Sequence, residues 1–109
     1  MKNKILIFGV VAVLFLGCKK KSAGPNEVYI QNYKFNPSSI TVSKGTTITW
    51  TNKESGIYPI THTVTSDNAI FDSDNLDKRQ QFSYTFSTPG TFPYHCNRHT
   101  DMKATVIVE

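Results

Sequence analysis

Cysteine is scarce in this chain, which has only two among its 109 residues. Cys18 directly follows an apolar N-terminal segment, so Cys96 is the only cysteine in the region after it. A disulfide within that region is therefore excluded. Its stability must come from a hydrophobic core, with some help from any metal that it binds.

Long apolar runs are scarce as well. The apolar segment at residues 5–16 is shorter than the ~20 residues that a membrane-spanning helix needs. Lys2 and Lys4 precede it and a glycine and Cys18 follow it, which is the layout of a secretory signal peptide. We therefore expect residues 1–17 to be a signal peptide and a poor transmembrane anchor.

The end of this segment, Phe15-Leu16-Gly17-Cys18, resembles the lipobox of bacterial lipoproteins, although Phe15 stands where leucine is usual. The resemblance implies cleavage before Cys18, lipid on that residue and anchoring to a membrane in the bacterial periplasm. Two alternatives stay open. An ordinary signal peptide would release a soluble periplasmic protein, and an uncleaved signal would itself serve as the anchor.

Net positive charge is confined to the N-terminal segment. Five of the twelve Lys and Arg residues precede Pro25, and all eight Asp and Glu residues follow it, so residues 26–109 have a net charge of −1. Such a domain has no surface suited to nucleic acid. Residues 18–25 combine like charges with chain breakers and are expected to form a flexible tether. The lysines of this tether could lie against the anionic head groups of membrane lipids.

Residues 26–109 are long enough for one domain with one core. Short alternating runs separated by turn residues predict an all-β sandwich. One strand is expected to begin at residues 28–30 and to end in the proline turn of 33–38, and another to cover 61–65. The remaining strands are expected at residues 40–42, 46–51, 82–86, 92–96 and 104–108. Alternation is expected to direct Ile48 and Trp50 to the inner face and Thr47, Thr49 and Thr51 to the outer face, and to direct Cys96 inward together with Phe92 and Tyr94.

Soft metal donors gather near the C-terminus. Cys96, His99 and Met102 follow one another at intervals of three residues, and His62 is the available fourth donor. Two histidines, a cysteine and a weak axial methionine form the ligand set of a blue-copper site. Zinc gains little from methionine, and its structural sites usually bring ligands in closely spaced pairs. His95 neighbours Cys96 on a strand, so it faces the other way and is given no metal role.

The chain from about Val28 to Val108 resembles the cupredoxins, in particular the amicyanin and plastocyanin types. These motifs carry the resemblance: Phe35-x-Pro37, Val42-x-x-Gly45-x-x-Ile48-x-Trp50-x-Asn52, His62-Thr63-Val64, and Gly90-x-Phe92-x-Tyr94-x-Cys96-x-x-His99-x-x-Met102. Thr100 and Ala104 depart from the proline and glycine frequent in the family, and the loop before His62 is longer than in amicyanin.

The resemblance implies an eight-stranded Greek-key sandwich that holds one copper ion, Cu(I) or Cu(II), through His62, Cys96, His99 and Met102. It also implies a monomeric one-electron carrier, not an enzyme, with redox partners such as cytochromes or copper and quinoprotein enzymes. The alternatives are a copper-binding or copper-delivery protein that does not shuttle electrons, and a structural module. Three histidines and one loop cysteine are too few for a second copper centre.

His99 is the expected port for electrons because it combines metal ligation with exposure. The apolar residues 57–60 either form a docking patch beside it or fold inward, and both alternatives stay open at this point. Arg98 is the charged residue expected to face a partner.

Overall fold

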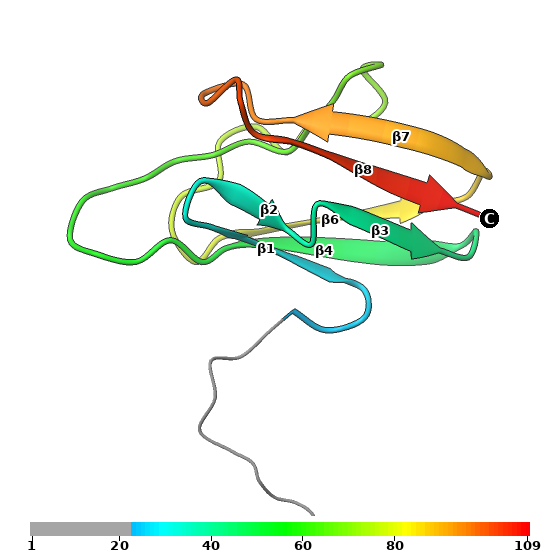
Figure 1. The fold of residues 1–109 in the computed structure, drawn as a ribbon, viewed down its shortest axis with the longest axis horizontal. Helices are drawn as coiled ribbons and strands as arrows, with labels where there is room; N and C mark the ends of the chain where they lie inside the picture. The colour runs from blue at the N-terminus through cyan, green and yellow to red at the C-terminus, as the bar shows by residue number, and fades with distance from the viewer. Residues whose placement is uncertain (1–22) are drawn as a thin grey trace, which may run out of the picture.

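The computed structural model describes residues 23–109, so the predicted signal peptide and the lipidation site at Cys18 lie outside this range. Within it the chain forms eight strands in two four-stranded sheets that face each other (Figure 1). The predicted all-β Greek-key sandwich of about eight strands is confirmed. No helix in the described part is long and apolar enough to cross a membrane.

The first sheet has the strand order β2-β1-β4-β6. Strand β1 pairs with β2 in antiparallel and with β4 in parallel orientation, and β4 pairs with β6 in antiparallel orientation. The bounds of these strands are β1 (Glu27–Gln31), β2 (Lys34–Asn36), β4 (Thr46–Asn52) and β6 (Gln81–Phe86).

The second sheet has the order β3-β8-β7-β5. Here β3 and β8 are parallel, whereas β7 pairs with both β8 and β5 in antiparallel orientation. The bounds are β3 (Ser39–Val42), β5 (Thr65–Ser66), β7 (Gly90–His95) and β8 (Lys103–Val108). The connection from β7 to β8 contains three of the four predicted ligands.

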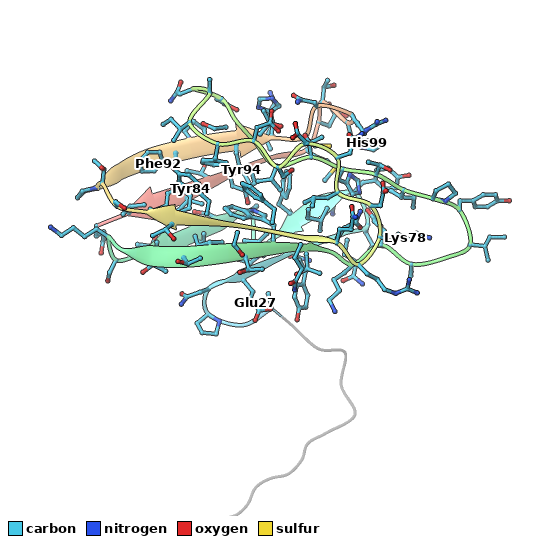
Figure 2. All side chains as sticks on the ribbon, turned by 180° about the vertical axis from the view of Figure 1, so that it is seen from behind. Glu27, Lys78, Tyr84, Phe92, Tyr94 and His99 are labelled. Atoms are coloured by element: carbon cyan, nitrogen blue, oxygen red, sulfur yellow. The ribbon has the colours of Figure 1, made fainter. Side chains whose placement is uncertain are left out.

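Alternation along the strands directs apolar side chains between the sheets. Ile48 and Trp50 are fully buried, as predicted, and Trp50 packs against Tyr94 of the opposite sheet with ring centroids 5.5 Å apart. Figure 2 shows Tyr94 between the sheets and His99 at one end of the sandwich. Thr51 was expected on the exposed face, but it is buried and accepts a hydrogen bond from Gln81.

Two strand predictions were wrong in their bounds. The first predicted strand is divided in two by a turn at Asn32 and Tyr33, which have φ of 55° and 59°. A two-residue hairpin with positive φ at both positions matches the twist of the strands that it joins. The predicted strand at residues 61–65 contributes only Thr65 to β5, while His62 forms an isolated bridge with Leu76 through two backbone hydrogen bonds.

Candidate metal centre

The loop after β7 is closed by its own backbone. The N–H of Met102 donates to the carbonyl of His99 at 2.9 Å, and the N–H of Cys96 donates to the carbonyl of Met102 at 3.1 Å. Cys96 itself lies just beyond β7 and is fully buried, so it keeps the inward direction predicted from Phe92 and Tyr94. The loop therefore holds its side chains against the end of the core.

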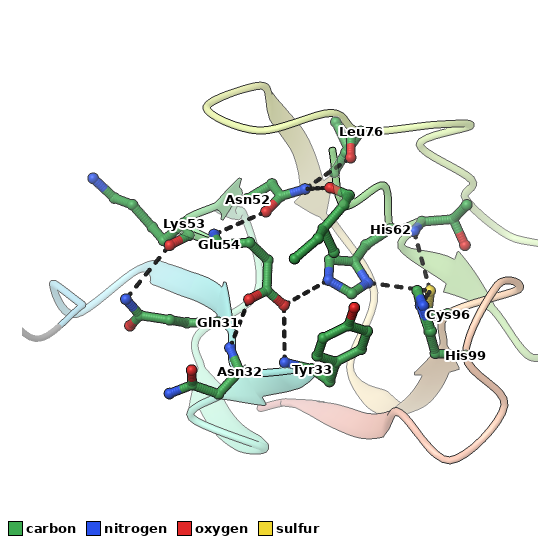
Figure 3. A network of polar contacts seen from close by, with 12 residues as sticks. Gln31, Asn32, Tyr33, Asn52, Lys53, Glu54, His62, Leu76, Cys96 and His99 are labelled. Atoms are coloured by element: carbon green, nitrogen blue, oxygen red, sulfur yellow. Dashed lines mark hydrogen bonds and ion pairs between the residues drawn. The ribbon is translucent and has the colours of Figure 1, made fainter. Parts of the chain in front are cut away.

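Three of the predicted ligands meet at this place. The donor atoms of His62, Cys96 and His99 all lie within 4.8 Å of one another. In each histidine it is Nδ1 that faces the sulfur, at 3.7 Å from Cys96 Sγ. Figure 3 shows the His62 imidazole directed at the Cys96 sulfur. A segment before β5 and a loop after β7, distant in sequence, thus supply one cluster of soft and borderline donors.

Met102 is buried, in line with Ala104 and the other inward residues of β8. Its backbone bonds to Cys96 and His99 place it beside the donor cluster. Its role as axial ligand stays a prediction.

The surroundings of Cys96 favour a thiolate. Burial by itself would raise the pKa of the thiol, but interactions with His62, the backbone N–H of Thr63 and His99 outweigh it and lower the pKa to about 6. The Thr63 N–H lies 3.3 Å from the sulfur. Because the thiolate is the form that binds metal, the site is prepared for a soft ion near neutral pH.

Glu54 lies behind His62, on the side away from the sulfur. Its carboxylate accepts a hydrogen bond from His62 Nε2 at 2.8 Å, and both side chains are buried. Burial would raise the pKa of Glu54, but the hydrogen bonds from Tyr33, His62 and Asn32 lower it overall. Burial would lower the pKa of His62, but Cys96 and Glu54 raise it overall.

Sequence reasoning missed Glu54, and it also missed Tyr33. The Tyr33 ring lies edge-on to both imidazoles, with centroids 5.4 Å from His62 and 4.7 Å from His99. The only sequence signal for Glu54 is its position two residues after the buried Asn52. Nothing local to Tyr33 indicates its place, since the turn that carries it was not predicted.

His95 faces away from the cluster, as expected from strand alternation. Its Nδ1 contacts Asp67, and its Nε2 lies 2.9 Å from Asn97 Oδ1. The Asp67 hydrogen bond raises the pKa of His95. Among the described residues, the donor cluster contains His62, Cys96 and His99 but not His95.

His99 is half-buried, whereas His62 and Cys96 are fully covered. It lines a hollow of about 320 Å³ together with Tyr33, Pro59, Ile60, Thr61 and Arg98. Residues 53–61 extend past the ends of the strands (Figure 1), and residues 59–61 of this segment line the hollow. In this segment Ile57 is 88% and Tyr58 73% exposed, so these two side chains do not fold inward, whereas Ile60 is half-buried.

A β-sandwich with thiolate, imidazole and thioether side chains at one end defines a protein with a mononuclear site for a soft metal ion. The chain belongs to the cupredoxin family: a family model described as Cupredoxin-like domain matches residues 5–108. The predicted family is therefore confirmed.

The curated relatives agree. The chain is 32% identical to amicyanin-alpha of Methylorubrum extorquens over 94% of this chain and 90% of the relative. It is 33% identical to amicyanin of Paracoccus denitrificans over 75% of this chain and 63% of the relative. Plastocyanin of Scenedesmus fuscus is 32% identical, with coverages of 69% and 86%.

Solved structures give the same result. A reduced Cu(I) form of an amicyanin variant superposes with a TM-score of 0.69 at 30% identity, covering 83% of this chain and 87% of that chain. A purple cupredoxin from Nitrosopumilus maritimus gives a TM-score of 0.67 at 26% identity, with coverages of 76% and 98%. Family and donor set together confirm the prediction of one copper ion as the cofactor.

Proposed function

We propose that the protein is a one-electron carrier that binds a single type 1 copper ion through His62, Cys96, His99 and Met102. The observation that carries this proposal is the convergence of three donor atoms within 4.8 Å at the end of a rigid sandwich. Copper, when bound, supplies a couple between two oxidation states that differ by one electron. No catalysis is proposed, because catalytic metal sites keep a coordination position open for water or substrate, and the four proposed ligands make up the full type 1 copper set.

The chain's own residues hold the donors in place. Electron transfer is fast only when the two oxidation states share nearly the same geometry, because rearrangement adds to the barrier. Hydrogen bonds within the Cys96 loop and the backbone pairing of His62 with Leu76 fix both ligand-bearing segments. The half-buried His99 then provides the path from the centre to the surface.

The hollow beside His99 suits a redox partner, such as a cytochrome or a copper or quinoprotein enzyme. Electron-transfer complexes use small and weak interfaces. The exposed Ile57 and Tyr58 provide apolar contact area, and Arg98 in the hollow provides a charge that steers association. We propose that the carrier acts as a monomer and docks through this end.

Spectroscopy combined with kinetics tests the proposal. Copper titration is expected to give one ion per chain, an intense visible absorption band from thiolate-to-copper charge transfer, and a type 1 EPR spectrum. Rapid mixing with a cytochrome c is expected to show electron exchange. Very slow exchange combined with ready release of copper would point instead to a copper-delivery protein, and failure to bind copper would point to a structural module.

We further propose that the protein acts in the bacterial periplasm, held to a membrane by lipid on Cys18. The lipobox-like residues before Cys18 support this proposal. The native protein is then expected to enter the detergent phase on phase separation, and the Cys18→Ser variant to stay in the aqueous phase. Equal partitioning of both proteins would contradict the lipid anchor and favour a soluble periplasmic carrier.

A further inference from the structure

The Glu54 carboxylate contacts both the predicted ligand His62 and the turn at Asn32 and Tyr33. Its Oε2 accepts hydrogen bonds from His62 Nε2 and from the backbone N–H of Tyr33, both at 2.8 Å. Its Oε1 accepts one from the backbone N–H of Asn32 at 2.9 Å. Figure 3 shows this carboxylate between the imidazole and the turn. One buried side chain therefore joins a predicted ligand to the β1–β2 hairpin.

The backbone around Glu54 is held as well. Its N–H donates to Asn52 Oδ1 at 3.0 Å. The amide nitrogen of Asn52 in turn donates to the carbonyl of Ile60 at 3.0 Å, two residues before His62, and to the carbonyl of Leu76 at 2.9 Å, the bridge partner of His62. The carboxylate is therefore fixed relative to the same segment that carries the imidazole.

The turn that Glu54 holds carries Tyr33. Without an acceptor, the N–H groups of Asn32 and Tyr33 would be left unpaired in a partly buried place, which is unfavourable. With the acceptor, the turn sets the Tyr33 ring edge-on against both imidazoles. The position of Glu54 thus determines what covers His62 and His99.

We propose that Glu54 is a positioning residue of the copper centre, which orients His62 and holds the Tyr33 turn over both imidazoles. A carboxylate can only accept, so the proton of the His62 ring lies on Nε2 and Nδ1 is left free for the metal. Partners of this kind fix the tautomer and the direction of a ligating imidazole. This inference rests on the proposed function and deepens it.

Replacing Glu54 with glutamine tests the assignment. The amide has one acceptor oxygen and one donor nitrogen, so Glu54→Gln cannot accept from His62 and from both turn N–H groups together. Loss of such a partner typically weakens metal affinity by about 10- to 100-fold. We expect a loss of this size in competition with a copper chelator, together with a rise in reduction potential, because a buried negative charge favours Cu(II).

Asp77→Asn is the matched control. Asp77 is another carboxylate near His62, but it is exposed and accepts from the Thr61 hydroxyl at 2.7 Å rather than from the ring. Removal of an exposed charge should change copper affinity by less than about fivefold. An effect of Glu54→Gln no larger than that of Asp77→Asn would overturn the proposal.

Hydrogen exchange of the copper-free protein gives a second readout that does not depend on the metal. The amide protons of Asn32 and Tyr33 are expected to lose protection in Glu54→Gln and to keep it in Asp77→Asn. Retained protection in both variants would contradict the role assigned to the carboxylate.

If Glu54→Gln does not fold, the unaltered protein decides the question. The nitrogen NMR spectrum of its Cu(I) form should show the His62 proton on Nε2, protected from exchange with water. Rapid exchange of the Nε2 proton with bulk water would overturn the inference, because it would show that the carboxylate does not hold the ring, whereas an unprotonated Nε2 would contradict ligation through Nδ1 itself. Because absorption and electron exchange of the unaltered protein are measured separately, the carrier function can stand when the role of Glu54 fails.

Discussion

The backbone N–H of Thr63 points at the sulfur of Cys96, with 3.3 Å between nitrogen and sulfur. In the other direction, the backbone N–H of Asn97, the residue after Cys96, donates to the Thr63 hydroxyl at 2.8 Å. The segment that carries His62 and the loop that carries Cys96 are therefore bonded to each other in both directions. The protein itself sets the separation of these two ligands.

The Thr63 hydroxyl, which accepts the Asn97 bond and also bonds to the Thr65 hydroxyl at 2.9 Å, can be removed without altering the backbone. Thr63→Val keeps the shape of the side chain and the N–H that faces the sulfur, but leaves the Asn97 N–H without its acceptor. The Asn97 bond is part-buried, and a typical intramolecular hydrogen bond contributes about 0.5–1.5 kcal/mol, so we expect the free energy of unfolding to fall by an amount in this range. Urea denaturation of the copper-free protein measures it, and the absorption of the copper-loaded variant should be kept.

Thr85→Val is the control for this change. The Thr85 hydroxyl bonds only to Thr47 on the exposed face of β4 and β6, at 2.6 Å. Water replaces that partner, so the free energy of unfolding should change by less than about 0.5 kcal/mol. Equal losses in the two variants would show that the Thr63 hydroxyl has no special part in joining the ligand segments.

Cys96→Ser is expected to abolish the intense visible absorption, because the charge-transfer band requires a thiolate. The smaller serine side chain should still fit the buried position, so the far-ultraviolet circular dichroism should be unchanged. A visible band of undiminished strength after Cu(II) is added would contradict the assignment of the sulfur as a ligand.

The histidines provide a matched comparison. His99→Gln should lose the visible band or shift it strongly, since an imidazole of the donor cluster is removed. His95→Gln removes a neighbouring imidazole that contacts Asp67 and Asn97 instead, and it should keep the band. The opposite result, with His95 needed and His99 dispensable, would require a different site.

Met102→Gln tests the axial position. An amide oxygen stabilises Cu(II) more than a thioether does, so the variant should keep copper and have a lower reduction potential. Cyclic voltammetry of the two proteins measures the difference. An unchanged or higher potential would mean that Met102 is a buried core residue without a bond to the metal.

The exposed loop tip offers a test of docking. Ile57→Ser combined with Tyr58→Ser removes apolar contact area while leaving the donor cluster intact. Electron exchange with a protein partner should slow, because the encounter complex is weakened, whereas oxidation by ferricyanide should keep its rate. Rapid-mixing kinetics with both oxidants separates these two effects.

Ile70→Ser is the control for the loop variant. Ile70 is also exposed, at 43%, but it lies outside residues 53–61, the segment whose residues 59–61 line the hollow beside His99. Its replacement should leave both rates unchanged. A partner rate that is insensitive to residues 57 and 58, and also to a charge reversal at Arg98, would place the docking surface elsewhere.

Local pattern was sufficient for much of this fold. Cys96, His99 and Met102 lie in one short stretch, so their spacing alone indicated a metal loop. Ile48, Trp50 and Tyr94 were predicted to face inward because strand alternation depends only on neighbouring residues, and all three are buried. These inferences needed no knowledge of how distant segments meet.

Other features depend on distant segments and had no local signal. Glu54 bonds to Asn32, which lies 22 residues away in sequence, so its role becomes visible only once β1 and β4 are paired. The turn at Asn32 and Tyr33 was missed because neither residue is glycine, although asparagine tolerates positive φ. The expected strand at His62 is replaced by a bridge to Leu76, a long-range contact as well.

The parallel pairing of β3 with β8 has a consequence for the order of events during biogenesis. The ligand loop is bounded by β7 and β8, and β8 pairs with β3 as well as with β7, so the sheet that carries the loop is complete only when this last strand has docked. Before that step the polypeptide has the sulfur and both imidazoles, but they are not yet assembled into a metal site. We therefore expect tight metal binding to follow the folding of the whole domain.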